Sequence, residues 1–339
     1  MAAGATTVAA VLDRLSRDGE ACFGAPIEAI RTGRAIHRHF SRVVRARVTA
    51  GGADRNIYIK VFRSPAGDPT SVDRLRVRVE REFRETARAH EAFAGRDGFA
   101  PVRALALYPD LLAIVTEEVK GIPFSTLLSR GARPWSSPGA LGPAARAARR
   151  AGEWLRRYQA MPSEPQPLAV SDLREYVDGR LRRLVGAGAG GFTEKLRGAL
   201  LDEFDMHAAR LRPFDLEAVP VHADFCPDNL LVDAGVLSVI DFAMAKRGLR
   251  YLDLSHLVIH LGFRTGLLWR SSAMRDVRAA LLDGYGDAAA AESPGFRIAL
   301  LVHVSALMAE RLNRASRLRA AKNVWLAPQI RRCLECVHA

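Results

Sequence analysis

The sequence predicts an α+β protein with two lobes, a small antiparallel-sheet lobe that carries one long helix and a larger lobe that is mostly helical. β-Branched and aromatic runs dominate residues 26–63, whereas apolar residues recur at helical spacing through 74–93 and in much of the chain after residue 124. The 339 residues, 49% of them hydrophobic, are enough for more than one lobe. We therefore expect a sheet lobe over residues 1–118 and a helical lobe over residues 119–339.

The small lobe is expected to open with an amphipathic helix, because apolar residues near positions 8–15 fall on one helical face. Two strands, FSRVVRARV and NIYIKVF, then flank a turn at Gly51-Gly52-Ala53-Asp54. The segment 74–93 follows as a long helix, with one apolar face made of Leu75, Val79, Phe83 and Ala87. Two more strands, on either side of a turn at 108–110, complete the lobe.

The larger lobe begins after Gly121, and residues 124–218 have mainly helical patterns. Two interruptions rich in glycine, proline or serine, at 131–143 and 186–191, divide these helices. A strand pair is expected within 219–242, and further helices are expected from there to the C-terminus.

The net charge of +13 comes almost entirely from arginine, because the chain contains only five lysines. The arginines are scattered, and the sequence has neither zinc-finger spacing nor an aromatic RNA-binding signature, so a nucleic-acid partner is not expected. The basic excess suits phosphate ligands, an anionic substrate or an acidic membrane surface.

The four cysteines have no disulfide-framework spacing, which indicates a reducing compartment. Cys333 and Cys336 form a lone CxxC with too few ligands for zinc, and they are expected to be an incidental pair on a C-terminal helix. The N-terminus lacks the features of a signal peptide, and the longest apolar run is too short to span a bilayer. A cytoplasmic protein is therefore predicted, with peripheral membrane contact left open.

Residues 221–242 read VHADFCPDNLLVDAGVLSVIDF and contain three oxygen-bearing side chains, Asp224, Asn229 and Asp241, beside two strand-like runs. Magnesium takes oxygen ligands, usually one or two carboxylates together with substrate phosphates. Asn229 and Asp241 can converge on such an ion, while Asp224, on the same loop, faces a nucleophilic hydroxyl. This spacing is the arrangement that the kinase fold uses for phosphoryl transfer.

The stretch HADFCPDNLLV…VIDF resembles the catalytic loop and metal-binding segment of the aminoglycoside phosphotransferase family. This kinase-like family also includes choline, homoserine and methylthioribose kinases, and its motif is roughly H-G-D-x-x-x-x-N followed by I-D-F. Ala223 stands where the family usually has glycine. The resemblance implies a protein-kinase-like bilobal fold. His222 is expected to pack beneath the loop as structural support, and Asp228 to cap the following turn.

The resemblance extends upstream to the residues that hold the nucleotide phosphates. Lys60, in the strand IYIKVF, stands where the family has a phosphate-binding lysine, and Glu82 aligns best as the helix glutamate that positions it. Glu80 and Glu85 stay open as alternatives, because the sequence does not fix the register of the helix.

Two further segments complete the resemblance, which covers most of residues 26–260. IVTEEVKG is similar to the connection between lobes, so Glu117, Glu118 and Val119 would offer backbone groups to the purine. In GLRYLDLSHL, Asp253 stands where the family has a second structural aspartate, which would brace the catalytic loop through hydrogen bonds.

The expected phosphate-covering loop, within RTGRAIHRHFSRV, departs from the family because it has one glycine, Gly33, and no glycine-rich run. Ser41 lies where many family members have a serine near the phosphates. Charge could come from neighbouring basic residues, Arg34, His37, Arg38 and His39. An ordinary basic hairpin turn stays open as the alternative to a phosphate-binding loop.

These assignments imply a small-molecule kinase that moves the γ-phosphoryl group of ATP, bound with Mg²⁺, to a hydroxyl. GTP stays open as the donor. A protein kinase needs a long activation segment and an A-P-E-like anchor. Here Asp241 and Asp253 are twelve residues apart, with no such anchor. The sequence sets no oligomeric state.

The acceptor is expected to be a small molecule or a glycan. Residues 245–339 contain 15 Lys and Arg against 7 Asp and Glu, a net charge of +8, which favours a sugar, a sugar phosphate or a lipid-linked glycan over a polycation. Two alternatives remain: an aminoglycoside kinase that confers antibiotic resistance, and a catalytically inactive kinase-like binding module.

Overall fold

The computed structural model describes residues 2–37, 41–63, 69–131, 139–265, 271–315 and 328. The chain divides into two compact units. The first, the sheet unit, consists of Met1–Ile122 and Asn229–Ala245, and the second, the helical unit, consists of Pro123–Asp228 and Lys246–Ala339. The chain passes from the first unit to the second within the short strand β6 (Ile122–Pro123).

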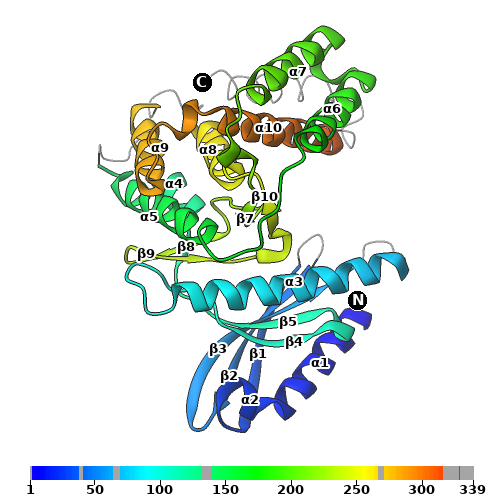
Figure 1. Cartoon of the computed structure of the whole chain (residues 1–339). Coiled ribbons are helices and arrows are strands. Elements are labelled where there is room, and N and C mark those ends of the chain that lie inside the picture. Colours follow the sequence, from blue (N-terminus) through cyan, green and yellow to red (C-terminus); the bar gives the residue numbers. More distant parts are fainter. Residues whose placement is uncertain are drawn as a thin grey trace. The chain divides into compact units, whose positions relative to one another are not determined.

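The sheet unit is built on five antiparallel strands in the order β1-β2-β3-β5-β4 (Figure 1). The strands are β1 (Ile27–His37), β2 (Ser41–Ala50), β3 (Ala53–Phe62), β4 (Ala104–Tyr108) and β5 (Ala113–Glu117). β2 and β3 join through Gly51 and Gly52, which both have positive φ, as a two-residue hairpin turn requires. The β2–β3 register sets Val43 opposite Lys60.

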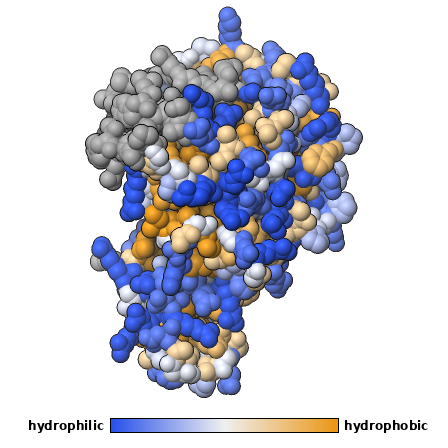
Figure 2. All heavy atoms as spheres, turned by 90° about the vertical axis from the view of Figure 1, so that its left-hand side faces the viewer, coloured by the Kyte–Doolittle hydropathy of each residue, from blue (hydrophilic) through white to orange (hydrophobic). Residues whose placement is uncertain are grey.

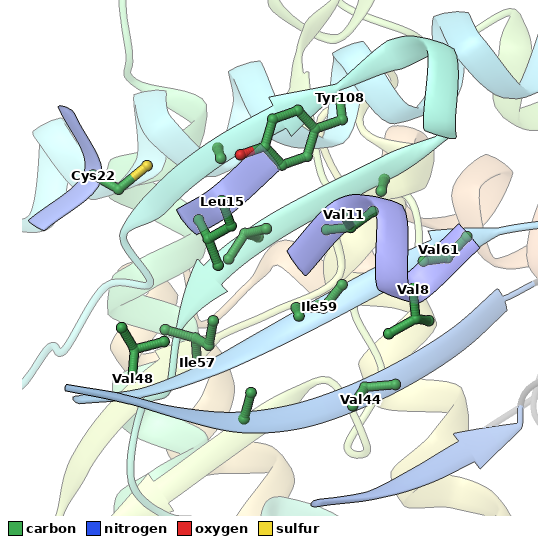
Figure 3. Close-up of a cluster of buried hydrophobic side chains, with 14 of the residues drawn as sticks. Val8, Val11, Leu15, Cys22, Val44, Val48, Ile57, Ile59, Val61 and Tyr108 are labelled. Atoms are coloured by element: carbon green, nitrogen blue, oxygen red, sulfur yellow. The ribbon is translucent and has the colours of Figure 1, made fainter. Parts of the chain in front are cut away.

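Helices cover both faces of this sheet, because successive residues of a strand point to opposite faces. On one face, α1 (Ala2–Arg17) and α2 (Gly19–Phe23) bury apolar side chains against odd-numbered residues of β3, as Figure 3 shows for Val11, Leu15, Ile57 and Ile59. On the other face, Leu75 and Val79 of α3 (Pro69–Phe93) pack with Phe62 and Ile114. The 3₁₀ turn η1 (Pro109–Leu111) links β4 to β5.

A second hairpin, far along the chain, also belongs to the sheet unit. It is formed by β8 (Leu230–Asp233) and β9 (Val236–Val239) and is followed by the 3₁₀ turn η4 (Phe242–Met244). Leu237 exchanges backbone hydrogen bonds with Gly98 and Ala100, and Ala243 packs into the core beneath α3. These contacts fix Asn229 and Asp241, the two ends of the hairpin, within the sheet unit.

The helical unit contains α4 (Phe124–Gly131), α5 (Gly142–Gln159), α6 (Val170–Gly186), α7 (Glu194–Ala208), α8 (Leu252–Thr265), α9 (Ser271–Tyr285) and α10 (Pro294–Ala315). Short 3₁₀ turns, η2 (Ala189–Gly191), η3 (Pro213–Leu216) and η6 (Ala290–Glu292), connect some of them. Two short strands, β7 (Val219–Val221) and β10 (Lys246–Gly248), pair antiparallel. In the sequence, the segment between them contains the loop 222–229 and the β8–β9 hairpin.

Most sequence-based expectations for the fold are confirmed. The mixed class, the antiparallel sheet, the long helix and the mostly helical remainder are all present. One expectation is wrong: Gly33, Arg34 and His37 lie on strand β1 and not in a loop between strands. Arg38, His39 and the Cys333–Cys336 pair fall outside the described residues.

Hydrophilic side chains cover much of the face that Figure 2 shows, in keeping with a composition that is 26% charged. The exposed large hydrophobic residues are spread over separate elements: Ile36, Val77, Tyr176, Met206, Phe214 and Met244. Within the described ranges, none of the helices combines the length and the hydrophobicity that crossing a membrane requires.

The closest helix contact in the helical unit, between α5 and α9, depends on two glycines. A Cβ atom at Gly152 would overlap the carbonyl oxygen of Leu281, and one at Gly284 would overlap the carbonyl oxygen of Arg149. The two backbones therefore approach more closely than any side chain allows.

We predict that Gly152→Ala lowers the free energy of unfolding by about 2–3 kcal/mol, because the new methyl group forces the helices apart. The matched control is Gly179→Ala on α6, where a Cβ meets no atom within 4 Å. The control is expected to gain about 0.5–1 kcal/mol from its higher helix propensity. Urea denaturation of both variants measures the difference, and equal stability of the two would contradict the proposed close contact.

Candidate active site

The centre of the candidate site in the sheet unit is the ammonium group of Lys60 on β3. Its Nζ lies 2.8 and 2.9 Å from the two carboxylate oxygens of Glu82 on α3, and 2.8 Å from Oδ1 of Asp241. It also lies 4.8 Å from the centre of the Phe62 ring. A buried ammonium needs such partners, because removing a charge from water without compensation is costly.

The two carboxylates around Lys60 differ in their access to solvent. The side chain of Glu82 is only 5% exposed, whereas that of Asp241 is 40% exposed. Glu82 therefore serves as a fixed anchor for the lysine. Asp241, with one oxygen on Lys60 and a partly open side chain, can contribute to a metal site.

The backbone of Asp241 adopts a left-handed conformation after the end of β9. The residue follows β9 and directly precedes η4, with φ of 67° and ψ of 63°, in the left-handed region that aspartate tolerates better than most residues. Asn229 is tied to the same end of the hairpin, because its carbonyl oxygen accepts a 3.0 Å hydrogen bond from the N–H of Ile240.

The charges in this cluster perturb the protonation of its members. Burial alone would lower the pKa of Lys60, but Glu82 and Asp241 outweigh it, so the pKa lies above its ordinary value and the amine stays charged. Burial raises the pKa of Glu82 to about 7, although Lys60 opposes this change. The lysine is therefore a permanent cation, suited to holding phosphate oxygens.

The helical unit carries the other candidate group, the loop that begins after β7. Asp253, at the start of α8, is fully buried and accepts hydrogen bonds from the N–H groups of His222 at 2.7 Å and Ala223 at 2.8 Å. The Nδ1 atom of buried His222 accepts a 3.3 Å hydrogen bond from the N–H of Asp224. These bonds fix the backbone of the residue that carries the candidate catalytic carboxylate.

Aromatic packing supports the loop from within the helical unit. Phe225, next to Asp224, is fully buried and stacks on Trp154 of α5 with ring centres 5.5 Å apart. The carbonyl oxygen of Asp224 accepts a 2.9 Å hydrogen bond from the N–H of Cys226, which closes a tight turn. The half-buried side chain of Asp224 is thus attached to a well-anchored backbone.

The expected purine-contacting segment lies at the end of β5. The N–H groups of Glu117 and Glu118 already donate to the carbonyl oxygens of Arg103 and Asn56. Purine contacts from these two residues would therefore use their carbonyl oxygens, and the Val119 backbone remains a candidate.

Sequence reasoning missed the side-chain partner of Glu118. Its carboxylate accepts hydrogen bonds from Nε of Arg45 at 2.7 Å and from Nη2 of Arg45 at 2.8 Å. Arg45 lies opposite Tyr58 in the β2–β3 register, two residues before Lys60 on the same face. The sequence offered one signal for this contact: once the β2–β3 hairpin is paired, Arg45 falls on the same sheet face as Lys60.

The predicted phosphate-loop residues that the structure describes lie on strands β1 and β2. Ser41 is the first residue of β2 and is 6% exposed, and it pairs with Phe62 in the sheet. It shares the face of Val43 and Lys60, because alternate residues of a strand point the same way.

The structure also selects among the three candidate glutamates on α3. Glu82 contacts Lys60, whereas Glu85 is paired with Arg84 and Arg88 on the same helix. No group of three or more His, Cys, Asp or Glu side chains within the described segments could hold a metal by itself. Asn229 and Asp241 fit magnesium, which takes few protein ligands and completes its shell with phosphate oxygens and water.

Comparison with known proteins defines the class of the chain. The sequence model of the phosphotransferase enzyme family, APH, matches residues 59–297, a span that includes the Lys60, Asp224 and Asp241 segments. The chain therefore belongs to the phosphotransferase enzyme family, and it is an enzyme of the small-molecule kinase class. A search of curated protein sequences found no match.

Solved structures of kinase-like fold resemble the whole chain. A thermostable mutant of aminoglycoside phosphotransferase APH(4)-Ia, in complex with ADP and hygromycin B, is 16% identical with a TM-score of 0.57, covering 96% of this chain and 98% of its own. A choline/ethanolamine kinase family protein from Mesorhizobium loti is 15% identical with a TM-score of 0.55, at 97% and 95% coverage. A glucosamine kinase is 16% identical with a TM-score of 0.51, at 91% and 94% coverage. At these identities the likeness establishes the fold, which confirms the expected protein-kinase-like class.

We predict that Ala223→Gly stabilises the protein by about 1 kcal/mol, because Ala223 has φ of 60° and an alanine is strained in this left-handed conformation. The control is Ala187→Gly, where φ is −87° and glycine only adds flexibility to the unfolded chain. Urea denaturation should show a gain for the first variant and a small loss for the second. A loss in both would mean that Ala223 is not strained.

Burial also gives Asp253 a measurable effect on stability, because it raises the pKa of this carboxyl to about 7, against the opposing backbone hydrogen bonds. The folded state then retains the proton to a higher pH than the unfolded chain, so this contribution is complete below pH ~4 and is lost as the pH rises through ~7. In Asp253→Asn, the free energy of unfolding should fall less steeply between pH 4 and 7 than in the wild type. Parallel pH profiles would contradict the raised pKa.

Proposed function

We propose that this protein transfers the γ-phosphoryl group of ATP to a hydroxyl group of a sugar-type or lipid-linked acceptor. The observation that carries the proposal is the contact of Lys60 with both Glu82 and Asp241, which joins three segments separated widely in the sequence. It is supported by membership in the phosphotransferase enzyme family.

Residues of the sheet unit are proposed to hold the nucleotide. Lys60, oriented by Glu82, holds the α- and β-phosphates, and Ser41 lies on the same sheet face. Backbone groups of Glu117, Glu118 and Val119 contact the purine. Residues 1–118 thus form a nucleotide lobe, with ATP as donor and GTP as the alternative.

Asn229 and Asp241 are proposed to hold Mg²⁺. When bound, the ion neutralises charge that grows on the β- and γ-phosphates during transfer. Asp241 would contribute a carboxylate oxygen to the ion, because its side chain is 40% exposed. Glu82 would serve as the second partner of Lys60.

Asp224 is proposed to orient the acceptor hydroxyl and to take its proton as the oxygen bonds to phosphorus and ADP leaves. The N–H of Asp224 donates to His222, and the N–H groups of His222 and Ala223 donate to Asp253, so these bonds hold the backbone of Asp224. Catalysis of this kind depends mostly on positioning and electrostatics. The lobe over residues 119–339 would supply the acceptor site.

The charges of the helical unit support a neutral or anionic acceptor over a polycation. Six of its carboxylates are paired with arginines of the same unit: Glu153, Asp178, Glu194, Asp205, Asp215 and Asp283. A carboxylate held by an arginine is less available to the amines of a polycation. A sugar-type acceptor also agrees with the glucosamine kinase among the similar structures.

The test is a panel of acceptors assayed for ADP and GDP release with each nucleotide. It contains neutral sugars, glucosamine, sugar phosphates, a lipid-linked glycan in vesicles, choline and hygromycin B. Asp224→Asn should lower kcat by about 10²–10⁴-fold, the usual contribution of a general base. Asp241→Asn should remove the Mg²⁺ dependence together with most of the turnover.

The matched control is Asp233→Asn, which changes an exposed carboxylate on the same hairpin as Asp241 and should keep wild-type turnover. Preferred turnover of hygromycin B would support the aminoglycoside-kinase alternative. Nucleotide binding without product release from any acceptor would support the inactive binding module and would refute the proposed activity.

A further inference from the structure

The catalytic loop is held at a second place, which the sequence motif does not include. The second residue of α4, Ser125, is buried and makes two contacts with this loop. Its N–H donates to the carbonyl oxygen of Pro227 at 3.1 Å, and its hydroxyl donates to Oδ1 of Asp228. The expectation that Asp228 caps a turn did not include this partner.

The position of Ser125 at the start of α4 explains why it is available for these contacts. N–H groups in the first turn of a helix have no acceptor within the helix, so they are free to bind groups outside it. Pro227, as an acceptor, therefore meets a donor that would otherwise be unpaired. The short serine side chain adds a second donor next to the first.

Ser125 and Asp253 together hold the loop from both ends. Asp253 of α8 binds the N–H groups of His222 and Ala223, and Ser125 of α4 binds Pro227 and Asp228. Asp224 lies between these two anchors. The backbone course of the loop is therefore set by two different helices.

We propose that Ser125 is a positioning residue for phosphoryl transfer, which fixes the loop segment that carries Asp224 and leads directly into Asn229. This inference rests on the proposed function. Without the hydroxyl, Asp228 loses this donor, while the N–H of Ser125 can still bond the carbonyl oxygen of Pro227. Small errors in the position of a catalytic group reduce turnover strongly, even when substrate binding is unchanged.

The first measurement is hydrogen exchange of the backbone amides of residues 222–229 in the wild type and in Ser125→Ala. Exchange at Cys226, whose N–H bonds to the carbonyl oxygen of Asp224, should accelerate in the variant. The matched control is Ser129→Ala, because Ser129 is an exposed serine on the same helix, α4, and its hydroxyl bonds the carbonyl oxygen of Ser125 rather than the loop. Unchanged exchange in Ser125→Ala would overturn the proposal.

The second measurement is steady-state kinetics with the preferred acceptor. Ser125→Ala should lower kcat by about tenfold or more while KM for ATP stays within about twofold. Ser125→Thr, which keeps the hydroxyl, should recover most of the turnover, and Ser129→Ala should match the wild type. The double variant Ser125→Ala with Asp228→Ala should lose no more than Ser125→Ala alone, because each change removes the same hydroxyl–carboxylate contact.

These outcomes separate this proposal from the proposed function. Wild-type kcat in Ser125→Ala, beside an inactive Asp224→Asn, would overturn the positioning role and leave phosphoryl transfer intact. No product release by the wild type with any acceptor would refute the transfer itself and, with it, the role of Ser125 in catalysis. The hydrogen-exchange result decides in either case whether Ser125 fixes the loop.

Discussion

The largely buried ammonium of Lys60 is the constraint on which the candidate site of the sheet unit depends. A charge in that position is tolerated only if carboxylates reach it, and the two that do come from α3 and from the end of β9. Residues 60, 82 and 241 are thereby joined, so the hairpin of β8 and β9 belongs to a unit whose other members precede it by about a hundred residues. The same electrostatic requirement that stabilises this arrangement leaves a permanent cation beside a partly exposed carboxylate.

In the helical unit, the corresponding feature is the anchoring of a short irregular loop, residues 222–228. Buried Asp253 accepts hydrogen bonds from the N–H groups of the two residues that precede Asp224. Buried Ser125 donates one hydrogen bond each to Pro227 and Asp228, which follow Asp224 in the sequence. Phe225 fills the space beneath, against Trp154. Satisfying buried polar groups in this way also fixes the backbone that carries Asp224, the proposed catalytic residue.

The sequence predicted helices and strands best where the hydrophobic pattern repeats over many residues. The helix predicted over 74–93, which the structure begins at Pro69, and the β2–β3 hairpin were clear, because many residues repeat the same pattern. Gly33 to His37 were misassigned to a loop, because a glycine and basic residues are typical of turns, and only pairing with β2 makes this segment a strand. β10 was missed because three residues carry no periodicity, and its strand character comes from pairing with β7.

By itself, the sequence predicted the candidate residues of the site: a lysine in an apolar strand, a loop carrying Asp224 and Asn229, and Asp241 at the end of the next run. These residues can be recognised from local sequence patterns, because the patterns do not depend on how the elements pack. Only the tertiary structure decided that Glu82, rather than Glu80 or Glu85, contacts Lys60, because the choice depends on how α3 is rotated against the sheet. Likewise, only folding brings Ser125 to Asp228, since no spacing in the chain encodes a hydrogen bond between residues 103 positions apart.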